Sequence, residues 1–266
     1  MKYIDIHSHL NLNQFDTDRE RVIEKLKSED IATITVGVDL ETSKFAVQLA
    51  EMHDNLFACV GLHPADNETE VFDYDKYLEL AKNEKVVAIG ECGLDYFRLP
   101  EGVNEIEEIK NKQKDIFKKH IGLAIELGKP LMIHARPSKG SMDAYADALD
   151  ILDLHKKENP SLLVNFHFFV GDTDIAQRII GNNWSMSFDG PITFARDYDE
   201  VIRLIPLHLI MAETDAPFAS PAPHRGKRCE PWMVGEVVKK IAEIKNLPQE
   251  EVEKALLENA KRVFDI

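Results

Sequence analysis

The sequence predicts a single (β/α)8 barrel that spans residues 1–266. Its 266 residues are close to the roughly 250 that such a barrel commonly needs. Short runs rich in Val, Ile, Leu and Phe alternate with longer amphipathic stretches along the whole chain. The runs are apolar almost throughout, which is typical of parallel strands covered by helices. Eight such runs are present, the number that closes a barrel of this class.

The predicted strands follow one another in regular order. They cover residues 3–6, 33–38, 57–60, 86–90, 131–133, 162–166, 184–188 and 209–212. Apolar residues at a spacing of three to four predict helices over 18–28, 42–52, 106–127, 143–156 and 174–180. Two more helices are expected over 231–245 and 248–257, each with Pro near its start, where a missing N–H is harmless. No linker and no internal repeat interrupts this order, so one domain is expected.

Composition and charge exclude several classes of protein. A net charge of −15 would repel a polyanion over most of the surface, so an anionic substrate needs a local positive site. No run is long enough to span a membrane, and residues 1–10 lack the apolar centre of a signal peptide. Three scattered cysteines, Cys59, Cys92 and Cys229, suit a reducing compartment. A soluble cytoplasmic protein with no membrane association and no evident obligate protein partner is expected.

His7 and His9 lie at the end of the first predicted strand. Side chains of an extended chain alternate, so residues two apart point to the same side, and one metal ion could bind both imidazoles. Taken alone, the pair could equally be two ordinary polar histidines. The residues that follow other predicted strands favour the interpretation of this pair as metal ligands.

Glu91 directly follows the fourth predicted strand. A carboxylate at the mouth of a barrel has two oxygens that can bridge two cations, although pairing with a nearby basic side chain is an equal alternative for an isolated residue. His134 and His167 follow the fifth and sixth strands, where each alone could be a hydrogen-bonded histidine beside the core.

Asp215 follows the eighth strand, in Glu213-Thr214-Asp215-Ala216-Pro217. By itself it could cap a turn, and its alternative role is a metal ligand and proton acceptor. The six candidate ligands fall after strands one, four, five, six and eight, on the barrel face that carries active sites in this fold. Their recurrence predicts one metal centre there.

The order His-x-His, acidic residue, His, His, Asp resembles the amidohydrolase-like metal-dependent hydrolases, and specifically the TatD-type deoxyribonuclease family. The resemblance extends over nearly the whole chain. It rests on Asp5-Ile6-His7-Ser8-His9, Gly61-Leu62-His63-Pro64, Gly90-Glu91-Cys92-Gly93-Leu94-Asp95-Tyr96, Ile133-His134-Ala135-Arg136, His167 with Gly171, and Glu213-Thr214-Asp215-Ala216-Pro217.

The resemblance implies two divalent metal ions. His7, His9, Glu91 and Asp215 would hold one ion, and Glu91, His134 and His167 would hold the second. Asp215 would also accept a proton from the attacking water. Two adjacent cations lower the pKa of a bound water and neutralise charge on phosphoryl oxygens, so hydrolysis is the expected reaction. The ligand set does not identify the metal, which could be Mg²⁺, Mn²⁺ or Zn²⁺.

Further residues near the predicted strand ends are candidates for the substrate site. His63, in a turn after the third strand, could contact phosphate or protonate a leaving oxygen, or could be an ordinary turn histidine. Arg136 could bind a phosphate through both guanidinium nitrogens, or pair with a loop carboxylate. Asp5 and Asp95 are expected to orient the ligands.

The segment His224-Arg225-Gly226-Lys227-Arg228 is the one dense basic run in this acidic chain. It follows the eighth strand, so Arg225, Lys227 and Arg228 could flank the metals and receive a nucleic-acid backbone, although such runs are usually solvated surface.

Three features differ from the family pattern. Cys229 replaces a common Asn, Val170 replaces a small hydroxyl residue, and the loop over residues 137–141 is longer than usual. None removes a candidate ligand, so these differences affect the substrate more than the chemistry.

The leading hypothesis is a metal-dependent deoxyribonuclease that hydrolyses phosphodiester bonds, trimming single-stranded or frayed DNA from the 3′ end, as the resemblance implies. The alternative is a hydrolase with two metal ions that acts on a small-molecule amide or ester. A non-catalytic metal-binding scaffold is disfavoured by the candidate phosphate-binding residues that accompany the ligands.

Overall fold

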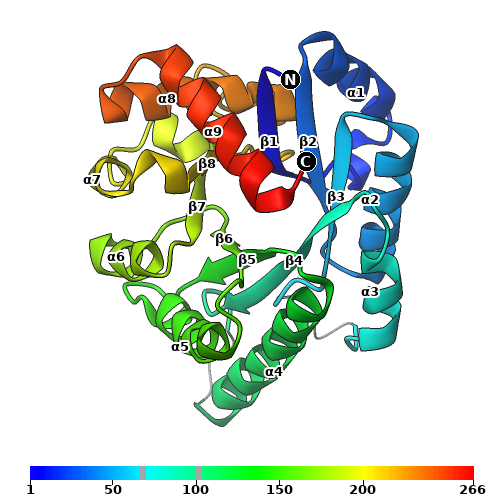
Figure 1. Ribbon diagram of the computed structural model, residues 1–266, viewed down its shortest axis with the longest axis vertical. Helices are drawn as coiled ribbons and strands as arrows, with labels where there is room; N and C mark the ends of the chain where they lie inside the picture. Colours follow the sequence, from blue (N-terminus) through cyan, green and yellow to red (C-terminus); the bar gives the residue numbers. More distant parts are fainter. Residues whose placement is uncertain (66–69, 100–102) are drawn as a thin grey trace.

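The computed structural model describes residues 1–65, 70–99 and 103–266, and its central feature is an eight-stranded parallel sheet. The strands lie side by side in chain order, as a barrel requires (Figure 1). They are β1 (Tyr3–Ser8), β2 (Ile31–Val36), β3 (Leu56–Val60), β4 (Val86–Asp95), β5 (Leu131–Arg136), β6 (Val164–Phe166), β7 (Ser185–Phe188) and β8 (Ile210–Ala212). A parallel bridge between Ser8 and Ala216 brings the two edges together at the carboxyl ends of β1 and β8. The predicted (β/α)8 barrel is confirmed.

Helices follow the strands and cover the outside of the barrel (Figure 1). They are α1 (Arg19–Ser28), α2 (Leu40–Met52), α3 (Tyr74–Ala81), α4 (Val103–Leu127), α5 (Asp143–Glu158), α6 (Thr173–Gly181), α7 (Asp199–Leu204), α8 (Val234–Lys245) and α9 (Gln249–Phe264). The helices α3 and α7 were not predicted. They have 8 and 6 residues, too few for a three-to-four spacing to repeat clearly.

The strand β4 is longer than predicted, so Glu91 lies within it and does not follow its end. Two glycines are accommodated within the longer strand. Gly90 and Gly93 have φ values of 153° and 133°, and the pairing with β5 shifts register between Ile89 and Cys92. Glycine at such a bulge lets a strand continue where other residues would be strained.

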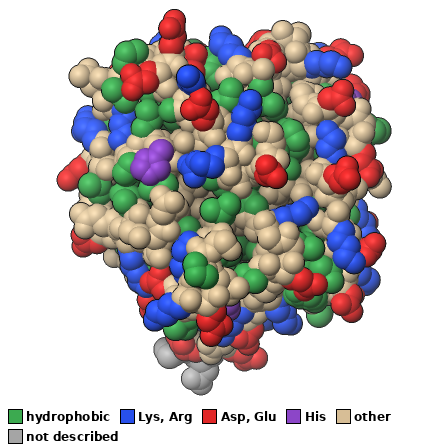
Figure 2. Space-filling model, in the orientation of Figure 1, with side chains coloured by type: hydrophobic (Ala, Val, Ile, Leu, Met, Phe, Trp, Pro, Cys, Tyr) green, Lys and Arg blue, Asp and Glu red, His purple; other side chains and the backbone are tan. Residues whose placement is uncertain are grey.

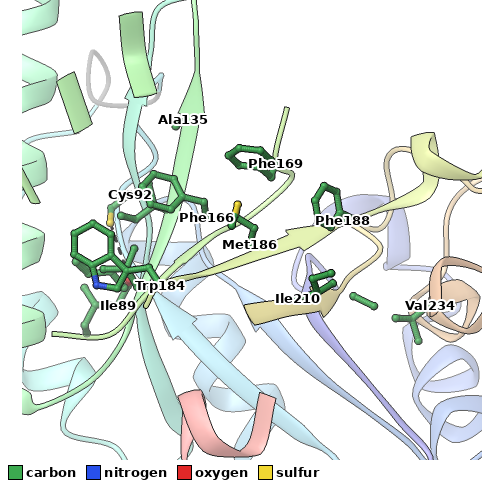
Figure 3. Close-up of a cluster of buried hydrophobic side chains, with 14 of the residues drawn as sticks. Ile89, Cys92, Ala135, Phe166, Phe169, Trp184, Met186, Phe188, Ile210 and Val234 are labelled. Atoms are coloured by element: carbon green, nitrogen blue, oxygen red, sulfur yellow. Dashed lines mark hydrogen bonds between the residues drawn. The ribbon is translucent and has the colours of Figure 1, made fainter. Parts of the chain in front are cut away.

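Two hydrophobic layers hold the barrel together. One lies between strands and helices, where Phe166, Trp184, Met186 and Phe188 are fully buried (Figure 3). The other fills the barrel interior, where α9 contributes Phe264 to the same cluster as the strand residues. Burial of this apolar surface is the main stabilising term, at roughly 25 cal/mol per Å².

The helix α9 covers the amino ends of the strands and leaves the carboxyl ends open. Asn259 Nδ2 donates to the carbonyl oxygens of Leu207 and Ile210, both at 2.8 Å, beside the start of β8. In Figure 1, α9 passes in front of the strands, and Figure 2 shows acidic and basic side chains interspersed over this side of the molecule. None of the described helices is both long enough and apolar enough to cross a lipid bilayer.

Candidate metal centre

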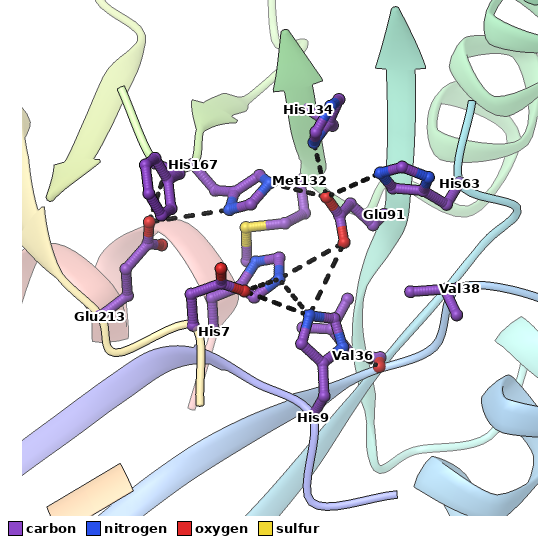
Figure 4. A network of polar contacts seen from close by, with 12 residues as sticks. His7, His9, Val36, Val38, His63, Glu91, Met132, His134, His167 and Glu213 are labelled. Atoms are coloured by element: carbon purple, nitrogen blue, oxygen red, sulfur yellow. Dashed lines mark hydrogen bonds and ion pairs between the residues drawn. The ribbon is translucent and has the colours of Figure 1, made fainter. Parts of the chain in front are cut away.

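All six predicted ligands meet at the carboxyl end of the barrel (Figure 4). β1 delivers His7 and, just beyond its end, His9, while β4 and β5 deliver Glu91 and His134. His167 directly follows β6, and Asp215 lies three residues after β8. Residues from opposite ends of the sequence therefore share one site because the sheet curves into a barrel.

The first cluster brings His7 and His9 together with two carboxylates. The two Nε2 atoms are 3.2 Å apart, which confirms that the side chains point to the same side. Asp215 Oδ1 lies 3.3 Å from His9 Nε2 and 3.8 Å from His7 Nε2. Glu91 Oε2 lies 3.5 Å from His7 Nε2 and 3.8 Å from His9 Nε2.

The second cluster is built around the other oxygen of Glu91. Oε1 lies 2.7 Å from His167 Nε2 and 2.9 Å from His134 Nδ1. The rings of His7 and His167 are stacked, with centroids 3.9 Å apart, so the two clusters are adjacent. Glu91 is the only one of these side chains whose two oxygens face different clusters, which is the arrangement expected of a bridging ligand.

The donor set fits a metal ion. His9 Nδ1 donates to the carbonyl oxygen of Val36 at 2.9 Å, so in the neutral ring the lone pair is on Nε2 and points toward His7. Two nitrogen lone pairs at this distance repel unless a cation or a proton lies between them. Ligands that bind one ion at about 2.0–2.2 Å are separated by about this distance.

Neighbouring side chains fix the orientation of the ligands. Asp95 Oδ2 lies 3.1 Å from His134 Nε2, a contact that would hold the His134 ring in place. Asp5 accepts hydrogen bonds from the backbone amide of Thr214 at 2.9 Å and from the side-chain hydroxyl of Thr214 at 2.6 Å. Glu213 was not singled out from the sequence, but its Oε1 lies 3.7 Å from His167 Nδ1. Glu213 is a second carboxylate two residues before Asp215, and this spacing is the sequence feature that could have indicated it.

Charges within the centre shift the pKa values of several ligands. Burial opposes ionisation of Glu91, but the charge on His167 and its hydrogen bonds with the histidines hold its pKa well below the usual range. Burial also opposes protonation of His9, yet the hydrogen bond and charge of Asp215 raise its pKa. His134 and His167 likewise have raised pKa values, because the carboxylates around them outweigh burial. Protons would therefore compete with a metal ion for these histidines.

Comparison with known proteins identifies the family. The sequence model of a family described as "TatD related DNase" matches residues 4–265 of the chain. The chain belongs to the TatD family of metal-dependent hydrolases. It is 40% identical to a Bacillus subtilis protein named "Uncharacterized metal-dependent hydrolase YabD", over 98% of both chains. It is 32% identical to the similarly named YcfH of Escherichia coli, over 100% of this chain and 97% of the relative.

Solved structures of the TatD family share the barrel. The crystal structure of YJJV, a TatD homolog from Escherichia coli, superposes with a TM-score of 0.85 at 26% identity, covering 100% of this chain and 98% of that one. A TatD family hydrolase from Entamoeba histolytica has a TM-score of 0.81 at 19% identity, covering 99% and 98%. The second likeness concerns the fold alone.

His63 joins this TatD centre from the loop after β3. Its Nε2 lies 3.6 Å from Glu91 Oε1, and its ring centroid is 4.5 Å from that of His134. A third group of potential ligand atoms lies nearby, with one atom each from His63, Asp95 and His134. These three atoms are all within 4.8 Å of one another. The structure thus brings His63 to the edge of the second cluster, within reach of a group bound there.

A cavity of about 630 Å³ opens over the metal centre. Its polar wall contains Arg136, a candidate for phosphate binding, and also Arg98, which was not singled out from the sequence. Its apolar wall includes Phe218 and Val170, one of the residues that differ from the family pattern. Cavities of roughly 300–1,000 Å³ are typical of ligand sites.

The basic run after β8 is only partly available to a substrate. The guanidinium of Arg225 lies over the Phe194 ring at 3.9 Å, and Lys227 is exposed. The guanidinium of Arg228 donates to both carboxylate oxygens of Asp18 at 2.8 Å. The structure does not place Arg228 in the described wall of the cavity, so substrate contact would require it to leave this ion pair.

Cys229, another departure from the family pattern, is fully buried, and its Sγ donates to the carbonyl oxygen of Thr214 at 3.8 Å. It therefore packs beneath the loop that carries Asp215. Residues 137–141, the third departure, lie between β5 and α5, and the hydroxyl and amide of Ser138 both donate to Asp143.

Proposed function

We propose that this TatD-family hydrolase is a divalent-metal-dependent deoxyribonuclease that hydrolyses phosphodiester bonds, acting from the 3′ end of single-stranded or frayed DNA. The observation that carries the proposal is the shared carboxylate of Glu91. Its Oε1 lies 2.7 Å from His167 Nε2, and its Oε2 lies 3.5 Å from His7 Nε2. Two adjacent ligand sets suit the hydrolysis of a phosphodiester by two metal ions.

Two ions, Mg²⁺, Mn²⁺ or Zn²⁺, would be held by the two ligand sets. His7, His9, Glu91 and Asp215 form the first set, and Glu91, His134 and His167 form the second. When bound, the ions supply an acidified water and positive charge for the phosphoryl oxygens. The mixture of imidazole and carboxylate ligands is compatible with each of these metals.

One of the ligands and two side chains around them have further roles in the proposed reaction. The carboxylate of Asp215 is 15% exposed toward the cavity, so it can accept a proton from water there. The imidazole of His63, 16% exposed in the same wall, is placed to donate a proton to the leaving oxygen or to bind phosphate. Arg136 can bind a phosphate oxygen through a charge-assisted hydrogen bond.

The proposed setting is the cytoplasm, with DNA as substrate and neither a membrane nor an obligate protein partner. The three cysteines are buried free thiols, which suits a reducing compartment.

The decisive test is cleavage of single-stranded DNA labelled at its 5′ end. Wild type is incubated with Mg²⁺, with Mn²⁺ or with a chelator, and compared with Glu91→Ala and Asp215→Ala. A metal-dependent ladder that shortens from the 3′ end, lost with chelator and in both variants, supports the proposal. A protein that binds metal yet leaves DNA intact in every condition contradicts it.

A small-molecule amide or ester hydrolase is the second candidate. The apolar wall of the cavity, formed in part by Leu12, Val38 and Phe168, is the observation that favours it. A screen of uncharged amides and esters against the metal-loaded protein distinguishes the two. Turnover there without DNA cleavage would select this candidate.

A further inference from the structure

The exposed aromatic side chains of the described residues all lie at the end of the barrel that carries the metal centre. They are Phe97, Phe194 and Phe218, which are 50%, 39% and 48% exposed. Phe97 follows β4, Phe194 follows β7 after a short 3-10 helix, and Phe218 follows β8. A single exposed phenyl ring is ordinary, but a set confined to the carboxyl ends of the strands is not explained by packing.

Two of these rings are covered on one side by an arginine. The guanidinium carbon of Arg136 lies 4.1 Å from the centroid of Phe97, and that of Arg225 lies 3.9 Å from the centroid of Phe194. Each pair combines a flat apolar surface with a positive charge. Arg136 also lines the cavity, so the Phe97 pair lies at its margin.

Phe218 is the exposed ring nearest to the first metal cluster. It lines the cavity, and its centroid lies 6.2 Å from that of the His9 ring, with the planes inclined at 66°. The amide of Phe218 donates to the carbonyl oxygen of Asp215 at 2.8 Å, so a tight turn ties the ring to a candidate ligand. A group bound to the metals would therefore have this ring beside it.

The aromatic rings and positive charges at these positions suit the binding of an unpaired nucleotide strand. Proteins that bind single strands combine positive charge along the backbone with aromatic rings on which bases stack. Bases in a duplex are stacked on one another, so their faces are not available to such rings. The chain has a net charge of −15, which makes arginines at this rim significant for attracting a polyanion.

We infer that Phe218 and the Phe97–Arg136 pair are base-stacking platforms on either side of the cavity, and that they select single-stranded over duplex substrate. Phe218 receives the base of the nucleotide at the metal centre, and Phe97 with Arg136 receives a neighbouring base. Phe194 with Arg225 is a second pair of the same kind at this end of the barrel. This inference rests on the proposed nuclease function and names the structural basis of its preference for single strands.

The test compares two labelled oligonucleotides that differ only in their bases. One is a single strand of thymidines, and the other carries base-free tetrahydrofuran units in place of its last three nucleosides. The full-length protein is compared with Phe218→Leu, which keeps apolar bulk but has no aromatic face, and with Phe218→Trp, which enlarges that face. Met52→Ala is the control, because Met52 is 63% exposed at the end of α2, away from the cavity.

We expect Phe218→Leu to lower kcat/KM on the thymidine strand by about 10-fold or more, as is typical when a base loses the aromatic ring on which it stacks. The same variant should cleave the base-free strand as fast as wild type does, while Phe218→Trp and Met52→Ala should resemble wild type on both. Phe97→Leu should behave as Phe218→Leu does, to a smaller extent.

Equal losses on both strands would overturn the inference, because the ring would then act on metal or backbone geometry. No loss on either strand would also overturn it. Absence of cleavage by wild type on both strands would instead contradict the proposed nuclease function itself. The controls therefore separate failure of the stacking role from failure of the activity.

Discussion

His9 and His134 at the metal centre each make a second hydrogen bond that sets the orientation of the ring. His134 shows this most clearly, because its Nδ1 faces Glu91 Oε1 at 2.9 Å while its Nε2 faces Asp95 Oδ2 at 3.1 Å. Burial opposes protonation of His134, but the hydrogen bond with Asp95 helps to raise its pKa. A carboxylate behind a ligating histidine holds the ring in place and makes it a better donor.

Replacing Asp95 by Asn should therefore weaken metal binding without removing a ligand of either proposed set. We expect a loss of about 10- to 100-fold in affinity for the second ion, measured by calorimetric titration of the metal-free protein. Asp147→Asn is the matched control, since Asp147 bonds to Tyr96 on the same side of the barrel but contacts no candidate ligand. Unchanged affinity in Asp95→Asn would show that the ring is held by other contacts.

At this scale the sequence indicated which candidate ligands come together, but not which basic side chains line the cavity. His7, His9 and Asp215 were recognisable because metal-binding residue types recurred at strand ends. Arg228 was predicted as a substrate contact, and nothing in the sequence indicated its ion pair with Asp18, because Asp18 is 210 residues away in the chain. Phe218 carries no signal in the sequence, because its exposure depends on how the loop after β8 folds over the barrel mouth.

At the scale of elements, β4 places Glu91 by means of glycine. The amide of Glu91 donates to the carbonyl oxygen of Gly37 at 3.1 Å, so its backbone is held against the loop after β2. Gly90 has a φ of 153°, and a Cβ there would lie 2.4 Å from the carbonyl oxygen of Met132. No side chain fits this position without displacing β5.

Gly90→Ala should therefore cost stability and also disturb the metal centre. We expect a loss of roughly 1–3 kcal/mol in the free energy of unfolding, as for other overpacked sites, together with weaker metal binding. Denaturant unfolding of the metal-free variant measures the first effect. Gly122→Ala in α4 is the control, because its Cβ meets nothing within 4 Å and Ala favours a helix. A variant as stable as wild type would contradict the steric argument.

The eight strands were predictable because burial on both sides makes their sequences apolar throughout. Their ends were less predictable, since a glycine bulge and a true strand end look the same in sequence. α3 presents another limit, because among its described residues only Tyr77 and Ala81 are buried. Such short helices are set by the barrel they cover.

At the scale of the whole molecule, metal binding should be coupled to pH and to stability. His9, His134 and His167 have raised pKa values in the metal-free protein, so protons compete with metal at these positions. Affinity should weaken as the pH falls from 8 to 6, because more of these histidines are protonated. Zn²⁺ titration in buffers of different ionisation enthalpy should show net proton release at pH 7. Heats independent of the buffer would contradict this.

The overall charge of −15 makes substrate binding depend on a few local cations. Arg136 lines the cavity, whereas Arg228 is held by Asp18 and Glu230 at 2.8 and 3.0 Å. Each phosphate contact on a single strand contributes about 0.7 to the slope of log affinity against log salt concentration. Arg136→Ala should therefore flatten this slope by about that amount for a single-stranded oligonucleotide.

Arg228→Ala provides the contrast, because its guanidinium is already neutralised by two carboxylates. This variant should leave the salt slope unchanged and should lower stability through the loss of its ion pairs. Binding is measured by fluorescence anisotropy with Ca²⁺ in place of the catalytic metal, over a series of salt concentrations. If Arg228→Ala flattens the salt slope and Arg136→Ala does not, the DNA strand follows the basic run after β8. That result would contradict binding of the strand across the cavity beside Arg136.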